Sequence, residues 1–149
     1  MLNWLKTNAT AARDKMKTEV AKYKNSDFMD AVVAGCAMVA AADGNISSDE
    51  KQKMAAFISR SEELSVFDMT KVIEAFNKIV EGFEFDAAIG KIEAMKKIGK
   101  LRGKDEAART MVRVCCVIGA ADGDFDADER KVVSEICTEL GLSPSEFDL

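Results

Sequence analysis

Two acidic loops contain the side chains in this sequence that are best suited to chemistry. Asp43 and Glu50 lie in the first loop, and Asp122 and Glu129 lie at the same spacing in the second. Carboxylate oxygens are the ligands that hard divalent cations such as Ca²⁺ and Mg²⁺ prefer. The aspartate, the glycine after it and the glutamate match positions five, six and twelve of a calcium-binding EF-hand loop. Positions one and three fall on apolar residues in both loops, so neither loop alone is an EF-hand.

The two loops are copies of one another. A shift of 79 positions lays residues 41–50 on residues 120–129 with six identities in ten, and it also aligns Cys36 with Cys115. We therefore expect a duplicated helix-acidic loop-helix unit, at about residues 27–60 and 106–140, with pseudo-two-fold symmetry. Such pairing would turn the loops toward each other and pool their carboxylates into one site for calcium or magnesium rather than zinc. The predicted ligands are Asp43, Glu50, Asp122 and Glu129.

The same loops also have a purely structural interpretation, as helix ends and helix caps. Ser47 or Asp126 would cap the following helix, and the glutamate three positions later would complete a capping box. The loop glycines permit the left-handed backbone that ends the preceding helix. The aspartates Asp43 and Asp122 stay unexplained, because an acid at a helix C-terminus meets the negative end of the helix dipole. A bound cation would remove that conflict.

The elements that must position these loops are helices. Apolar residues recur every three or four positions along almost the whole chain, there is only one proline, and 48% of the residues are hydrophobic. We expect an all-α fold, a single compact domain over residues 1–149, with about seven helices joined by short turns. The first helix is expected within residues 2–23, and the fifth should have one apolar face formed by Ile89, Ile92, Met95 and Ile98. Helix boundaries are expected at Asn25, Ser26, Asp86, Gly103 and Gly141.

Composition argues against several classes of function. The chain has no histidine and no Ser-His-Asp or phosphate-loop pattern, so we expect a protein that is not an enzyme. The net charge of −5 argues against nucleic-acid binding. The four cysteines stand among apolar neighbours, which predicts reduced core thiols. The sequence shows no apolar run that could cross a bilayer and no signal peptide, which predicts a cytoplasmic location.

Two further segments carry clustered positive charge. Residues 91–104 contain six basic side chains against the single acid Glu93. They form either a solvated face or a docking surface for an acidic partner or anionic lipid. The N-terminal stretch, residues 2–23, mixes apolar and basic residues and is compatible either with peripheral membrane contact or with packing on the helical core.

The doubled Ala-Ala-Asp-Gly loop, each time followed by an Asp-Glu pair that opens a helix, resembles the TerB family of tellurite-resistance proteins. The resemblance covers essentially the whole chain. It implies a component of a tellurite-resistance and stress-response system, cytoplasmic or peripheral to the inner membrane. It also implies a TerC-type membrane protein and TerD-type proteins as partners. The family's acidic residues, proposed there as metal ligands, correspond to Asp43, Glu50, Asp122 and Glu129.

Three hypotheses follow. The leading one is a scaffold or sensor that binds a divalent cation through its paired acidic loops and docks protein partners through charged faces. The second is a metal-free structural adaptor whose loops are only helix caps. The third is thiol-dependent tellurite or redox chemistry.

Overall fold

A computed structural model describes residues 18–21, 23, 25–42, 46–60, 64–120 and 125–149, apart from the side chain of Glu50. These residues form six α-helices and two short 3-10 helices, and no strand occurs among them, which confirms the all-α prediction. Residues 18–21, within the predicted first helix, are helical as well. The α-helices are α3 (Ser26–Ala40), α4 (Ser48–Arg60), α5 (Met69–Phe85), α6 (Ala87–Ile98), α7 (Asp105–Gly119) and α8 (Ala127–Leu140).

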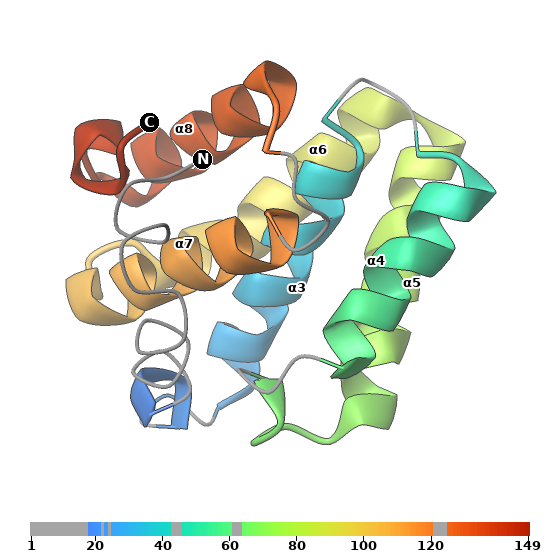
Figure 1. Cartoon of the computed structure of the whole chain (residues 1–149), viewed down its shortest axis with the longest axis horizontal. Coiled ribbons are helices and arrows are strands. Elements are labelled where there is room, and N and C mark those ends of the chain that lie inside the picture. The colour runs from blue at the N-terminus through green and yellow to red at the C-terminus, as the bar shows by residue number, and fades with distance from the viewer. Residues whose placement is uncertain (1–17, 22, 24, 43–45, 61–63, 121–124) are drawn as a thin grey trace.

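Helix α3 is the centre of the molecule. Its residues 31–39 are all buried, since this apolar stretch is enclosed by neighbouring helices on every side. It contacts α4, α5, α6, α7 and α8, with α4 and α5 on one side of it and α7 and α8 on the other (Figure 1). The two predicted units, residues 27–60 and 106–140, thus cover the helix pairs α3–α4 and α7–α8. Their pseudo-two-fold relation stays a prediction.

Local capping explains where the helices begin and end. Asn25 caps α3 by accepting a hydrogen bond from the backbone N–H of Phe28 at 2.9 Å. Asp86 caps α6 in the same way, through the backbone N–H groups of Ala88 and Ile89. Gly141 ends α8 in the left-handed conformation, with φ of 74°. Each of these boundaries agrees with the sequence prediction.

Only the C-terminal part of the apolar face predicted for the fifth helix, α6, lies against the core, because Ile98 is buried and Met95 is partly buried. The face that α6 buries is formed by Gly90, Ala94 and Ile98. Ile89 and Ile92 point to solvent, with 41% and 63% of their surface exposed. The buried face is lined by small residues because α5 and α6 approach closely, and a Cβ on Gly90 would lie 2.6 Å from the backbone of Phe83.

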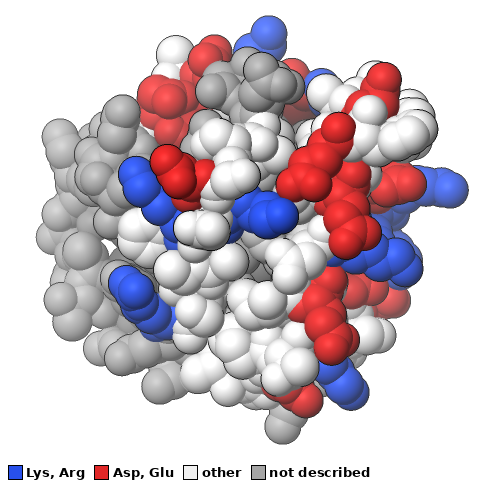
Figure 2. Space-filling view, turned by 90° about the vertical axis from the view of Figure 1, so that its right-hand side faces the viewer, with Lys and Arg blue, Asp and Glu red and all other residues white. Residues whose placement is uncertain are grey.

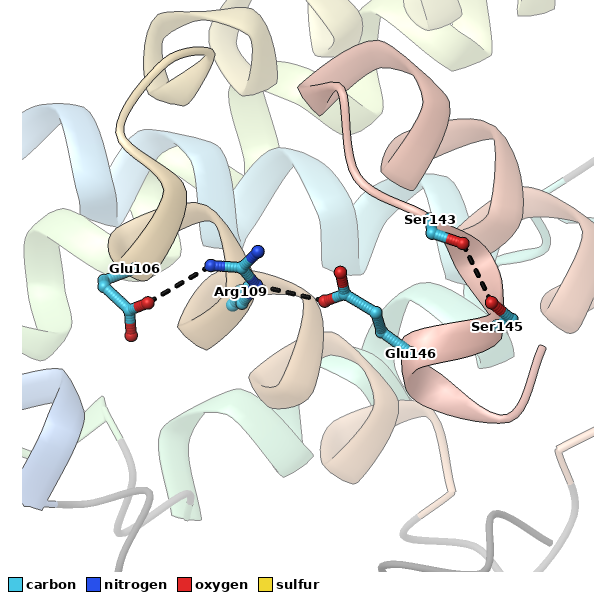
Figure 3. A network of polar contacts seen from close by, with 5 residues as sticks. All are labelled: Glu106, Arg109, Ser143, Ser145 and Glu146. Carbon is cyan, nitrogen blue, oxygen red and sulfur yellow. Dashed lines mark hydrogen bonds and ion pairs between the residues drawn. The ribbon is translucent and has the colours of Figure 1, made fainter.

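The C-terminal segment is fastened to α7 and α8. The 3-10 helix η3 (Pro144–Phe147) buries Phe147 to 1% exposure, and Arg113 lies over its ring. Arg109 in α7 donates to Glu146 at 3.0 Å and to Glu106 at 3.1 Å (Figure 3). The bond to Glu146 is the main reason that the pKa of the Arg109 guanidinium is raised.

Candidate functional site

The first turn of α8 contains the predicted ligand that the structure describes in full, Glu129. Asp126 is the N-cap of α8, and its carboxylate accepts a hydrogen bond from the backbone N–H of Glu129 at 2.8 Å. The Glu129 side chain in turn accepts from the backbone N–H of Asp126 at 3.3 Å. This reciprocal pair is the capping box that the structural interpretation predicted.

The remaining predicted ligands are described in part or not at all. Asp43 and Asp122 lie outside the described residues, as do the loop glycines Gly44 and Gly123. Glu50 belongs to α4, but its side chain also lies outside the described part. Helix α4 begins directly after Ser47, whose carbonyl accepts from the backbone N–H of Lys51 at 2.9 Å, so Ser47 occupies the predicted cap position.

One cavity adjoins both repeat units. It has a volume of about 160 Å³ and lies among the C-terminal ends of α3 and α7, the middle of α4 and the first turn of α8. Its lining combines three carboxylates of the α8 end with one lysine and apolar side chains of α4. The lining residues are Val39, Ala40, Ala42, Lys53, Met54, Phe57, Ile118, Gly119, Asp126, Asp128 and Glu129.

The helix ends that lead into the two acidic loops are in contact. A Cβ built on Gly119, the last residue of α7, would lie 3.2 Å from Cγ1 of Val39 near the end of α3 and 3.0 Å from the ring of Phe125. Phe125, which opens the segment before α8, is buried with 8% exposure. The chain therefore leaves α3 toward Asp43 and leaves α7 toward Asp122 from adjacent points.

The carboxylates in the described part of the chain do not complete a metal site. No group of three or more Asp, Glu, Cys or His side chains with a geometry that could hold an ion occurs among the described residues. Lys53 in α4 also lines the cavity, so one basic side chain borders it beside the carboxylates. Sequence analysis did not single out Lys53, because its position beside the cavity depends on how α4 packs.

Much of the basic segment, residues 91–104, is paired with acids that are distant in sequence. Lys91 contacts Glu135 of α8 at 2.6 Å, Lys97 lies 3.9 Å from Asp30, and Lys100 lies 3.7 Å from Asp30 and from Asp27. Lys96, Arg102 and Lys104 have no ion pair among the described residues. Fewer basic residues of this segment are therefore available to bind a partner than the sequence suggested.

A band of acidic side chains marks another side of the molecule. Figure 2 looks onto the side that α4 and α5 form and shows these acids gathered on it. Helix α5 carries three exposed glutamates, Glu74, Glu81 and Glu84. Glu84 forms an ion pair with Lys51 of α4 at 3.3 Å.

The cysteines are core residues, as predicted. All four are buried and carry free thiols. A hydrogen bond with Cys36 and burial raise the pKa of Cys115 well above the ordinary thiol range. Burial likewise raises the pKa of Cys116, and it raises that of Cys137 to about 12. Because the thiolate is the reactive form, these positions disfavour nucleophilic thiol chemistry.

Comparisons with known proteins agree with the doubled motif. The family model described as tellurite resistance protein TerB matches residues 29–149. A tellurium resistance protein TerB from Alcaligenes sp is 50% identical over 105 residues, which are 70% of this chain and 86% of that protein. No solved structure matches. In the described residues, no helix combines the length and the apolar content that crossing a membrane requires. The chain belongs to the TerB family of tellurite resistance proteins.

Proposed function

We propose that this protein is a non-enzymatic component of a tellurite-resistance and stress-response system that binds a divalent cation between its two acidic loops. One observation carries the proposal: the ends of α3 and α7, from which the two loops depart, touch each other and line one cavity. Three residues of chain span at most about 11 Å. Asp43 and Asp122, each three residues beyond its helix end, are therefore within reach of that cavity.

The available donors suit a hard cation. Besides Asp43 and Asp122, the proposed ligands are Glu50 and Glu129, and Asp126 and Asp128 line the same cavity. All of these donors are carboxylate oxygens, the chemistry that calcium and magnesium prefer over the nitrogen and sulfur ligands of zinc. The ion would neutralise two aspartates that follow helix C-termini, where negative charge is unfavourable. It would also join the two repeat units.

A metal-free adaptor is the second candidate function, and one observation favours it. The capping box of α8 already uses a Glu129 oxygen and an Asp126 oxygen for backbone hydrogen bonds. If the first loop is built in the same way, both glutamates serve as caps. The protein would then act through its charged faces alone.

Partner docking completes the proposal. The resemblance implies a TerC-type membrane protein and TerD-type proteins as partners, with the protein in the cytoplasm or peripheral to the inner membrane. The basic side chains of residues 91–104 that have no ion pair among the described residues, Lys96, Arg102 and Lys104, and the exposed glutamates of α5 are the charged groups available for such docking. Nucleic acid is not an expected partner, because the net charge is −5. Thiol-based tellurite chemistry is disfavoured by the burial of all four cysteines.

Metal titration followed by backbone-amide NMR tests the cation site. Metal-free protein is titrated with calcium, then magnesium, then zinc, and saturable shifts at both Gly44 and Gly123 with one equivalent of calcium or magnesium are expected. The double substitution Asp43→Asn plus Asp122→Asn should abolish them. The control Glu74→Gln plus Glu81→Gln removes the same charge from exposed positions of α5 and should retain most of the affinity. Unchanged affinity in the first variant would leave the loops as helix caps.

A further inference from the structure

We propose that the solvent-facing side of α6 is a self-association surface, on which a second copy of this chain docks in antiparallel orientation about a two-fold axis. The inference does not depend on the cation site. The inference rests on three observations. Apolar side chains are exposed in a stripe, acidic and basic side chains lie at its opposite ends, and a groove lies at the basic end.

The stripe consists of three large apolar side chains that the fold leaves uncovered. Phe85 is 81% exposed, Ile92 63% and Ile89 41%, and they are the large hydrophobic residues most open to solvent among those described. Ile89 and Ile92 are three positions apart on α6 and share one side of that helix. Phe85 is the last residue of α5 and lies at the turn just before α6, next to the extended N-cap Asp86. Lys96, one turn beyond Ile92, continues the stripe. Contiguous exposed apolar side chains of this kind mark interaction surfaces.

Opposite charges lie at the two ends of the stripe. The exposed carboxylates of Glu84 and Asp86 flank Phe85 at the turn between α5 and α6, and Glu84 also pairs with Lys51 of α4 at 3.3 Å. About 15 Å along the helix axis, at the rise of a regular α-helix, the other end is basic. There a groove of about 410 Å³ is lined by Lys78, Ile79, Glu93, Lys96, Lys97 and Lys100. Lys97 and Lys100 also lie near Asp30 of α3, so Lys78 and Lys96 are the cations of this groove that have no ion pair among the described residues.

An antiparallel pairing makes this surface complementary to itself. With the two-fold axis between Ile89 and Ile92, Ile89 of one copy meets Ile92 of the other. The protruding Phe85 and Asp86 of each copy then reach the lysine-lined groove of the other copy, where Phe85 offers its ring face to an ammonium group. A two-fold contact of this kind is isologous, so every favourable contact occurs twice. One helix face per copy is a small interface, which predicts a dissociation constant on the order of 0.1 mM.

Sedimentation velocity of the full chain at rising concentration, at low and high salt, measures the association. We expect a monomer–dimer equilibrium that weakens with salt, with concentration-dependent amide shifts confined to α6 and the turn before it. Ile92→Glu places a charge in the apolar centre and should weaken association roughly tenfold or more. Gln52→Glu adds the same charge at an exposed position of α4 and should leave association unchanged.

Exchanging the two opposite charges tests whether a second copy of this chain, and not another partner, binds the stripe. Glu84→Lys and Lys96→Glu should each weaken the dimer, and the double variant should recover most of the lost affinity because the two charges face each other across the axis. The proposal is overturned if the chain stays monomeric up to about 1 mM, well above the expected constant. It is equally overturned if the double variant is no better than the single ones, or if the monomer instead binds lipid vesicles through Ile92.

Discussion

At the scale of single residues, the carboxylates of the second loop have a structural role. Asp126 and Glu129 satisfy two backbone N–H groups at the start of α8, which would otherwise lack a partner inside the helix. This role leaves lone pairs on both carboxylates for ion binding, because each ionised carboxylate offers about four acceptor positions and the capping box uses one of them. The cap and the proposed site can therefore be tested separately.

Asp126→Ala should lower the free energy of unfolding by about 1 kcal/mol, within the usual 0.5–2 kcal/mol for loss of a helix cap. Asp126→Asn should change it little, because asparagine caps as well as aspartate does. Urea denaturation in the presence of a chelator measures both variants without any contribution from metal. Equal losses in the two variants would show that charge, and not capping, is what Asp126 contributes.

Cys116 makes stability depend on pH in the alkaline range. Burial raises its pKa in the folded protein, so the folded thiol stays neutral while the unfolded thiol ionises near its ordinary value of about 8.5. This contribution is complete below that pH and is lost as pH rises, by up to about 1.4 kcal/mol per pH unit.

Denaturant titrations under reducing conditions between about pH 8 and 10, across the ordinary thiol pKa, measure this slope. Cys116→Ala should be less stable at neutral pH, because it leaves a cavity, but its stability should fall less steeply with pH. If the stability of the variant falls with pH as steeply as that of the parent chain, Cys116 ionises as readily in the folded state as in the unfolded state.

At the scale of elements, the hairpin of α5 and α6 is defined by close backbone contact. Gly90 faces the backbone of Phe83, and Gly82 packs against Gly90 and the carboxylate of Glu93. This close approach directs the small side of α6 inward, which leaves Ile89 and Ile92 on the outside. The proposed self-association surface is thus a consequence of glycine at position 90.

Gly90→Ala should destabilise the protein by about 1–3 kcal/mol, the usual cost of overpacking, because the added methyl group meets backbone atoms that cannot rotate away. Gly99→Ala is the matched control. Gly99 has ordinary helical dihedral angles, and its nearest neighbour is the flexible end of Glu139, so that variant should be neutral or slightly stabilised. Thermal and urea unfolding of the two variants compare them directly.

At the scale of the whole molecule, the two repeat units meet where α3 and α7 end. An ion bound between the loops would therefore link the units and stabilise only the folded chain. Linkage predicts a gain of about 2.7 kcal/mol when the free ion is at a hundredfold excess over its dissociation constant. The gain should be absent in Asp43→Asn plus Asp122→Asn. Unfolding midpoints measured with and without calcium test this, and a gain that persists in that variant places the ion elsewhere.

The sequence by itself determined the features that depend on neighbouring residues. Asn25, Asp86, Asp126 and Gly141 mark helix ends because a cap interacts only with backbone groups a few positions away. The helical period predicted the all-α class, and the repeated loop predicted the family. These signals are local, so they can be read without knowing which helices are neighbours.

Only the tertiary structure decided the rest. Which residues of α6 are buried depends on the approach of α5, and periodicity alone did not show that Ile89 and Ile92 stay exposed. The lysines of residues 91–104 acquire partners from α3 and α8 that are distant in sequence. The contact between the ends of α3 and α7, on which the proposed cation site depends, joins positions 80 residues apart. Each of these features arises from packing between residues that are distant in sequence, and no local sequence pattern predicts that packing.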